Sequence, residues 1–139
     1  MYITLCSSAS FFDRLHNLSQ AIERQGYGVY LPSMKDYSAT NYQENAFVKI
    51  QNNLIKEHFR KIDLSGAIYV ANYDKNGISG YIGGNCFLEM GKAFDRDIPI
   101  FLMQPVPIEM SYRDELLALQ PIVIGTDFNL LNTPLRNKL

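Results

Sequence analysis

Short apolar runs alternate along the chain with longer stretches in which apolar residues recur at helical spacing. The apolar runs predict five strands, at residues 2–6, 28–31, 67–71, 98–103 and 121–124. They are bounded by Gly, Pro, Ser or Asn, which are typical of turns. The runs at 67–71 (AIYVA) and 98–103 (IPIFLM) are almost continuously apolar, which indicates strands buried on both faces.

The stretches between these runs predict helices. They cover residues 12–22, 44–60, 85–95 and 111–119. Phe12, Leu15, Leu18 and Ile22 share a face of the first, which Gly26 ends. Phe47, Ile50, Leu54 and His58 share a face of the second. In the third we expect Leu88, Gly91 and Phe94 to face inward, and in the fourth Ser111 is the candidate N-cap, with Asp114 three residues later.

Strands that alternate with helices favour an α/β fold with a parallel sheet covered on both faces. We therefore predict a Rossmann-like or flavodoxin-like three-layer sandwich with a five-stranded, mainly parallel sheet. Residues 34–43 and 72–80 are expected to be loops or turns. A single domain over residues 1–128 is expected, followed by a loose polar tail at 129–139.

Composition narrows the class of protein. The 139 residues suffice for one domain, and 47% hydrophobic with 19% charged residues excludes a disordered chain. The chain has no apolar run of about 18 residues and no signal-peptide pattern at its start, so we expect a soluble, cytoplasmic protein. Thirteen basic and fourteen acidic residues argue against a nucleic-acid polymer or a membrane as partner. A single nucleotide remains possible.

The cysteines and histidines do not form a recognisable metal or disulfide pattern. Cys6 and Cys86 both lie in apolar segments, so we expect two buried free thiols. The two histidines and two distant cysteines lack zinc spacing, and we expect neither a metal nor a cofactor.

The candidate functional residues are those that come directly after the predicted strands, because ligands of parallel sheets bind at the carboxyl ends of the strands. The unusual segment is residues 77–93, in which four glycines precede a helix. Gly83 and Gly84 let the backbone approach a ligand, and Asn85 is a candidate N-cap. Ser8 follows the first strand and Asn72 the central one, and Tyr81 could stack on a base or simply pack.

Glu89 lies about one turn into that helix, among apolar neighbours. A partly buried carboxylate near the positive end of a helix dipole suits nucleophilic attack on a sugar carbon. The alternative is a solvated glutamate paired with Lys92 at i,i+3. His58 has two interpretations as well, as a contact or proton donor for the ligand or as a half-buried structural histidine.

The run IGGNCFLEMGKA at residues 82–93, followed by IPI at 98–100, resembles the Gly-x-x-x-Glu-hydrophobic-Gly-x-Ala signature of the nucleoside 2-deoxyribosyltransferase family. That family includes the 2′-deoxynucleoside 5′-phosphate N-hydrolases. The segment ITLCSS at residues 3–8 is similar to its first strand and serine-containing loop. With the strand order, the similarity extends to about residue 127.

This resemblance implies an N-glycosyl transferase or N-glycosidase acting on a nucleoside or its 5′-monophosphate. Glu89 would attack C1′ and expel the base, and a second base or water would capture the glycosyl enzyme, as in a retaining glycosidase. Ser8 would contact ribose or phosphate, with Asn72, Tyr81, Gly83, Gly84 and Asn85 around the substrate. The resemblance also implies a homodimer or higher homo-oligomer, to which Phe47, Phe59 and Tyr112 could contribute.

At three positions that would assist the proposed nucleophile, this chain carries residues that differ from those typical of the family. Gly83 stands where the family has an aspartate or serine, Thr4 where a tyrosine is frequent, and His58 near a second aspartate, with Asp63 out of register. These changes leave open a nucleotide-sensing module without catalysis. A phosphoribohydrolase of the cytokinin-activating type is a further alternative, although its Pro and Gly-Thr are missing. A Rossmann dehydrogenase or a flavodoxin-like carrier is disfavoured by the first loop.

Overall fold

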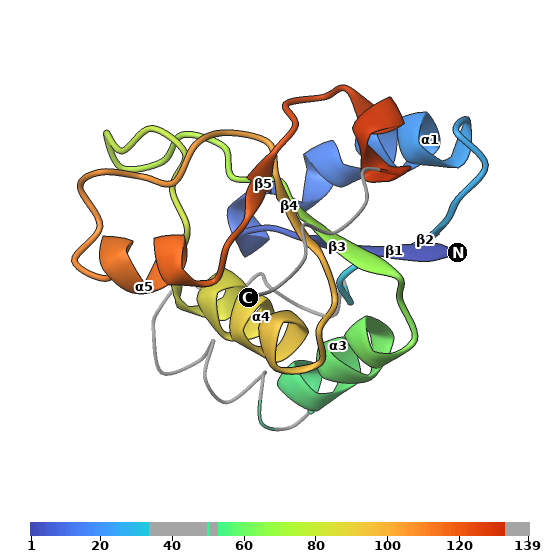
Figure 1. Cartoon of the computed structure of the whole chain (residues 1–139), viewed down its shortest axis with the longest axis horizontal. Helices are drawn as coiled ribbons and strands as arrows, with labels where there is room; N and C mark the ends of the chain where they lie inside the picture. The colour runs from blue at the N-terminus through green and yellow to red at the C-terminus, as the bar shows by residue number, and fades with distance from the viewer. Residues whose placement is uncertain (34–49, 51–52, 133–139) are drawn as a thin grey trace.

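The sheet organises the molecule. The computed structural model describes residues 1–33, 50 and 53–132. The strands are β1 (Tyr2–Cys6), β2 (Gly28–Tyr30), β3 (Ala67–Val70), β4 (Ile100–Leu102) and β5 (Ile122–Val123). They form one five-stranded sheet in the order β2-β1-β3-β4-β5, and every neighbouring pair is parallel. The predicted parallel sheet is confirmed, with the run at 67–71 in its central strand (Figure 1).

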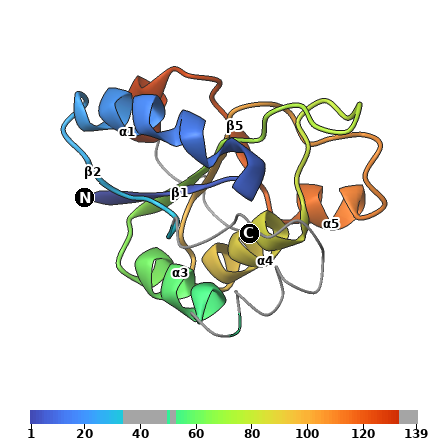
Figure 2. The ribbon, with the colours of Figure 1, turned by 180° about the vertical axis from the view of Figure 1, so that it is seen from behind.

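Helical segments cover both faces of this sheet, which gives the three predicted layers (Figures 1 and 2). One face carries the 3₁₀ segment η1 (Ala9–Arg14), α1 (Leu15–Glu23) and the 3₁₀ segment η2 (Phe128–Asn132). The other carries α3 (Leu54–Asp63), α4 (Gly84–Asp95) and α5 (Arg113–Ala118). No helix among the described residues is both long and apolar enough to cross a bilayer.

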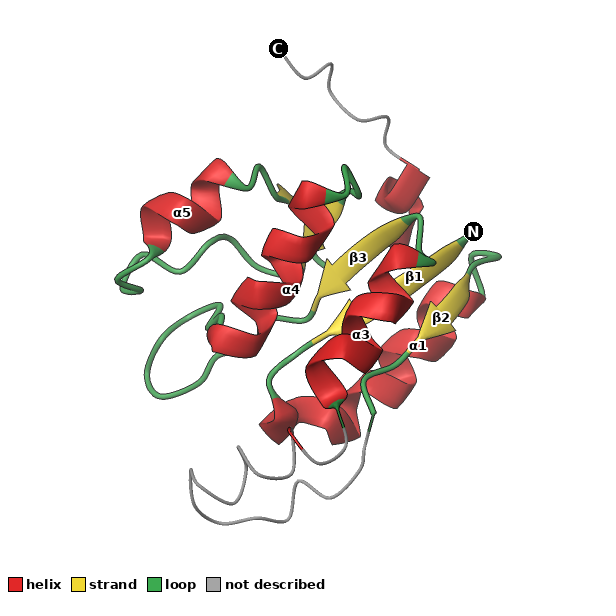
Figure 3. Ribbon diagram, turned by 90° about the horizontal axis from the view of Figure 1, so that it is seen from below, coloured by secondary structure: helices red, strands yellow, loops and turns green. Residues whose placement is uncertain are grey.

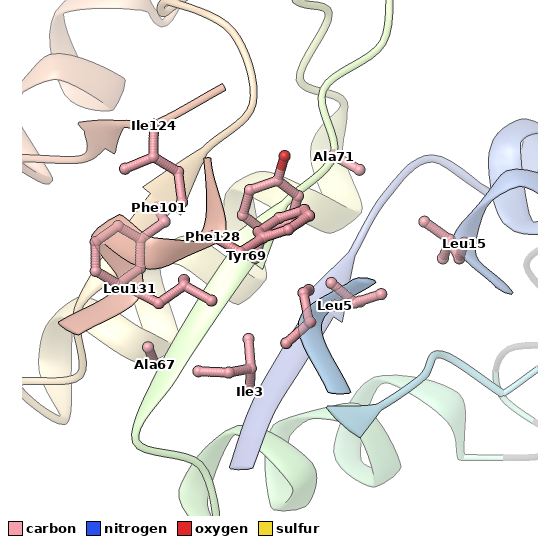
Figure 4. Close-up of a cluster of buried hydrophobic side chains, with 11 residues drawn as sticks. Ile3, Leu5, Leu15, Ala67, Tyr69, Ala71, Phe101, Ile124, Phe128 and Leu131 are labelled. Carbon is pink, nitrogen blue, oxygen red and sulfur yellow. The ribbon is translucent and has the colours of Figure 1, made fainter. Parts of the chain in front are cut away.

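Alternation along the strands divides the core into two clusters, because successive side chains point to opposite faces. Ile3, Leu5 and Tyr69 pack toward α1 and η2 (Figure 4). Cys6 and Val70 belong to the cluster toward α3, α4 and α5. The central strand β3 is thus apolar throughout because its two faces pack against the two clusters, as its sequence predicted.

Helix boundaries and faces differ from the prediction in several places. Within the helix predicted at 44–60, Ile50 is helical, and α3 begins at Leu54 and continues to Asp63. Asn53, just before it, has a left-handed φ of 52°. Residues 44–49 and 51–52, with Phe47, lie outside the described residues, as does the loop predicted at 34–43.

Helix α4 forms where it was predicted, but with another face inward. Its buried residues are Cys86, Met90 and Ala93, whereas Leu88 and Phe94 are exposed. The i, i+4, i+7 set that begins at Cys86 is equally apolar, and it is this set that packs on the sheet. The expectation that Leu88 and Phe94 face inward is therefore wrong.

The predictions for the last two segments also need correction. Helix α5 begins at Arg113 with Tyr112 at its N-cap and no side-chain cap hydrogen bond, so Ser111 does not cap it. Phe128–Asn132 forms η2, and Leu131 is buried in the core. The packed part of the chain therefore extends beyond the domain boundary predicted at residue 128. The reason is that Leu131, an apolar residue in the segment predicted to be a polar tail, packs in the core. Residues 133–139 lie outside the described residues.

Candidate functional site

The candidate site lies at the carboxyl ends of β1 and β3. The strand order reverses direction between these two strands, which is where doubly wound sheets place their ligands. Cys6 is the last residue of β1 and Ser7 follows it. The Ser7 hydroxyl donates a 3.0 Å hydrogen bond to the carbonyl oxygen of Ala71, just after β3. This bond ties the two strand ends together beneath the site.

Helices α3 and α4 lie side by side over these strand ends and supply the two central polar side chains (Figure 3). His58 lies on the face of α3 that also buries Leu54 and Ile62. Its Nε2 is 3.3 Å from Oε2 of Glu89 on α4, and the two side chains are 7% and 15% exposed. Oε2 itself is buried and makes no hydrogen bond among the described residues. The imidazole is therefore a close polar neighbour of this carboxylate oxygen.

Cys6 completes a compact group of three side chains. Its Sγ is 3.4 Å from His58 Nε2, and the ligand atoms of Cys6, His58 and Glu89 all lie within 4.8 Å of one another. Burial raises the pKa of the Cys6 thiol well above its ordinary value, and the charge of Glu89 raises it further. Burial likewise raises the pKa of Cys86. Both cysteines are buried and free, as predicted, and both hold their protons at neutral pH.

A cleft opens beside this group, between α3 and α4. Ser7 and Phe12 line it from the first strand and η1, His58 from α3, and Asn85 and Glu89 from α4. Leu88, which the sequence placed in the core, lines it as well. The mixture of apolar walls with a few convergent polar groups is typical of small-molecule sites.

Of the predicted site residues, His58, Asn85 and Glu89 line this cleft, and five others do not. Those five are Ser8, Asn72, Tyr81, Gly83 and Gly84.

Ser8 belongs to a second polar group at the same sheet edge. Its hydroxyl accepts a 2.9 Å hydrogen bond from Lys75 Nζ and lies 3.1 Å from the Ser10 hydroxyl. The same ammonium lies 5.4 Å from the centre of the Tyr81 ring. Lys75 thus links the loop after β1 to the loop after β3.

Asn72 is a structural residue in this arrangement. It is 2% exposed, and its Nδ2 donates to the carbonyl oxygens of Gly80 and Gln104, at 3.3 and 3.0 Å. Its Oδ1 accepts a 2.9 Å bond from the Gln104 amide. Gly80 has a φ of +68°, and a Cβ there would lie 2.8 Å from the Pro105 carbonyl oxygen. Asn72 therefore holds a glycine-dependent loop in place.

The start of α4 differs from the prediction. Gly83 is the N-cap and Gly84 the first helical residue, so Asn85 lies inside the first turn and is not the cap. Gly83 has an extended backbone, and its carbonyl accepts the Phe87 amide at 3.0 Å. A Cβ on Gly83 would come within 3.1 Å of the Tyr81 ring. Glycine therefore fits here because an aromatic ring packs closely, a contact that the sequence spacing did not indicate.

The surface pair of Glu89 with Lys92 does not form. Lys92 Nζ instead lies 3.3 Å from Asp63, and Arg96 Nε lies 3.0 Å from the same carboxylate oxygen. Asp63 thus joins the C-terminal ends of α3 and α4 and takes no part in the cleft. Thr4 is also structural, because its hydroxyl lies 2.6 Å from that of Ser65 in the interior.

The parallel sheet, its strand order and the flanking helices define a flavodoxin-like α/β fold. A solved 2-deoxyribosyltransferase from the psychrotolerant bacterium Bacillus psychrosaccharolyticus, described as a biocatalyst for nucleoside synthesis, shares this fold with a TM-score of 0.51. The two chains are 20% identical over 96% of this chain and 92% of that one. No protein-family model matches the chain, and no curated sequence matches it. The resemblance noted in the sequence is thereby confirmed at the level of the fold.

Proposed function

We propose that this protein cleaves or exchanges the N-glycosidic bond of a nucleoside, deoxynucleoside or corresponding 5′-monophosphate, with Glu89 as the nucleophile. The observation that carries the proposal is the position of the Glu89 carboxylate. It is largely buried, faces His58, and lines a cleft at the switch point of the sheet. A largely buried carboxylate held in the wall of a cleft is suited to attack on an electrophilic carbon.

In the proposed first step a carboxylate oxygen of Glu89 bonds to C1′ of the sugar. The C1′–N bond breaks, its electron pair leaves with the base, and the base takes up a proton from solvent. The product is a glycosyl ester of Glu89. In the second step water or another base attacks C1′, the ester C1′–O bond breaks with its electron pair returning to the carboxylate, and the attacking molecule loses a proton to solvent. Division of one difficult displacement into two lowers the barrier of each, as in retaining glycosidases.

His58 has a positioning role in this scheme. Its Nε2 lies between Glu89 and Cys6, 3.3 Å from the carboxylate oxygen, so the imidazole limits the movement of the carboxylate by direct contact. A polar neighbour at this distance also offsets part of the cost of burying the carboxylate. Asn85, one turn before Glu89 on the same helix, lies on the cleft wall where it could reach a sugar hydroxyl.

The group around Lys75 supports the 5′-monophosphate as a substrate. Ser8, Ser10 and Lys75 place two hydroxyls and an ammonium together at the sheet edge where ligands bind. A phosphate monoester is recognised by this combination of donors.

A nucleotide-sensing module is the second candidate function. Thr4 is engaged with Ser65, and Gly83 is packed against Tyr81, so neither position offers a polar helper to the cleft. Binding of nucleotides without release of the base would assign this function to the chain.

The test is a panel of nucleosides and 5′-monophosphates, with free base measured by chromatography. Release of base in water indicates hydrolysis, and base exchange in a mixture indicates transfer. Glu89→Gln preserves shape but removes the attacking charge, so we expect turnover to fall by several orders of magnitude while ligand binding persists.

The matched control is Glu115→Gln, which makes the same change on an exposed position of α5. It should leave turnover unchanged. A Glu89→Gln protein with wild-type turnover would contradict the proposed nucleophile. Loss of binding by about 1–3 kcal/mol without a separate effect on turnover would instead assign Glu89 to a sugar hydroxyl.

A further inference from the structure

We propose that Cys6, His58 and Glu89 form a binding site for a divalent cation of the zinc type. The three side chains come from β1, α3 and α4, and they are far apart in the sequence. Their ligand atoms converge within 4.8 Å; Cys6 and His58 are buried, and Glu89 is partly buried at the cleft. The spacing along the chain conceals this site, because each ligand lies on a different element.

The distances match what such a cation requires. Zinc binds sulfur at about 2.3 Å and nitrogen or oxygen at about 2.0 Å, so tetrahedral ligands lie roughly 3.3–3.6 Å apart. His58 Nε2 is 3.4 Å from Cys6 Sγ and 3.3 Å from Glu89 Oε2. Both separations lie in that range, and the ligand atoms of Cys6 and Glu89 lie within 4.8 Å of each other, so a cation could bind the three atoms after a small adjustment of the side chains.

The donor types select among cations. A thiolate, an imidazole and a carboxylate suit Zn²⁺ and its borderline-soft relatives, whereas Mg²⁺ and Ca²⁺ prefer oxygen ligands. Three protein ligands leave a fourth position open, and the cleft lined by His58 and Glu89 gives that position and the entering ion access to solvent.

Charge balance supports the same cation. Binding converts the Cys6 thiol to a thiolate, and its proton passes to solvent. One thiolate and the Glu89 carboxylate then carry two negative charges, which the two positive charges of the ion cancel, while His58 remains neutral. The ion also provides a partner for Glu89 Oε2, which is buried without a hydrogen bond among the described residues.

Occupation of this site would stop the proposed chemistry, because the cation binds the carboxylate that attacks C1′ and withdraws its negative charge. This inhibition rests on the proposed function, but the metal binding does not. The site would therefore make the enzyme responsive to free zinc.

The experiment titrates the full chain, stripped of metal and kept reduced by a phosphine, with Co²⁺ and then with Zn²⁺. We expect one ion per chain and a thiolate-to-cobalt charge-transfer band. Cys6→Ser should abolish the band and weaken Zn²⁺ binding at least about tenfold. Cys86→Ser alters the other buried thiol, which is not among the three ligands, and should leave the band and the affinity unchanged.

A second variant keeps the test valid if Cys6→Ser fails to fold. Glu89→Gln changes a partly exposed side chain, and it should retain the thiolate band while binding Zn²⁺ at least about tenfold more weakly. Absence of stoichiometric binding in the folded wild-type chain would overturn the proposal. So would a band that is lost in Cys86→Ser and kept in Cys6→Ser.

Nucleoside cleavage, measured in the presence of a chelator, separates this proposal from the proposed function. Cleavage without any metal binding overturns the metal site alone. Metal binding without cleavage of any compound in the panel contradicts the proposed function alone and supports the metal site.

Discussion

Replacement of Asn72 by alanine should destabilise the fold, because this side chain connects two loops at the edge of the sheet. It makes three hydrogen bonds, two to carbonyl oxygens of Gly80 and Gln104 and one from the Gln104 amide. Each bond contributes about 0.5–1.5 kcal/mol, and the partners left behind are partly or fully buried. The expected loss in free energy of unfolding is about 2–4 kcal/mol.

Urea unfolding followed by circular dichroism measures this loss. With an m-value of about 2 kcal/mol per molar urea for a chain of this size, the midpoint should fall by about 1–2 M. The matched control is Asn129→Ala, since Asn129 is exposed and bonds only to nearby Asp127 among the contacts described. It should change stability by less than about 0.5 kcal/mol.

The result also decides between two roles for Asn72. A structural residue lowers the midpoint and leaves the affinity of the folded protein for its ligand nearly unchanged. A midpoint within about 0.25 M of wild type, combined with a loss of ligand affinity, would refute the structural assignment. It would restore the sequence-based prediction that Asn72 contacts the substrate.

Two further predictions concern pH and assembly. Because burial raises the pKa of Cys6 and Cys86, stability is fully present below the ordinary thiol pKa of about 8.5 and decreases as the pH rises above it. Urea midpoints at about pH 7 and 9.5 test this, and equal midpoints would contradict it. We also expect at least a homodimer, since Ile55 and Leu88 expose apolar surface on the cleft. A monomer mass by light scattering at tens of micromolar, roughly the concentration at which a specific dimer persists, would contradict it.

The strands were predictable because a strand that is buried on both faces is apolar at nearly every position. Residues 67–71 are apolar at every position, since β3 packs on both clusters of the core. The inward face of α4 was not predictable from periodicity, because the sets that include Cys86 and Leu88 are similarly apolar. Only the contact with the sheet distinguishes them.

The candidate site was predictable only in part. Glu89 and His58 could be singled out because a carboxylate and an imidazole stood among apolar neighbours. Their pairing, and the approach of Cys6, depend on how α3 and α4 pack across β1, which no local pattern records. Ser7 and Ser8 are adjacent in the sequence, and it is the direction of each side chain after the strand that brings Ser7 to the cleft and Ser8 to Lys75.

The Asp63 contacts fix α3 and α4 to each other at one end, and this has a mechanical consequence. With a helical rise of about 1.5 Å per residue, His58 lies about 7.5 Å from that end of α3 and Leu54 about 13.5 Å. A rotation of about 10° around the joined end would therefore move His58 by roughly 1.3 Å and Leu54 by roughly 2.4 Å. Such a rotation would displace Leu54, at the far end of α3 in the cleft, more than His58, which lies beside the carboxylate where geometric precision matters most for bond formation.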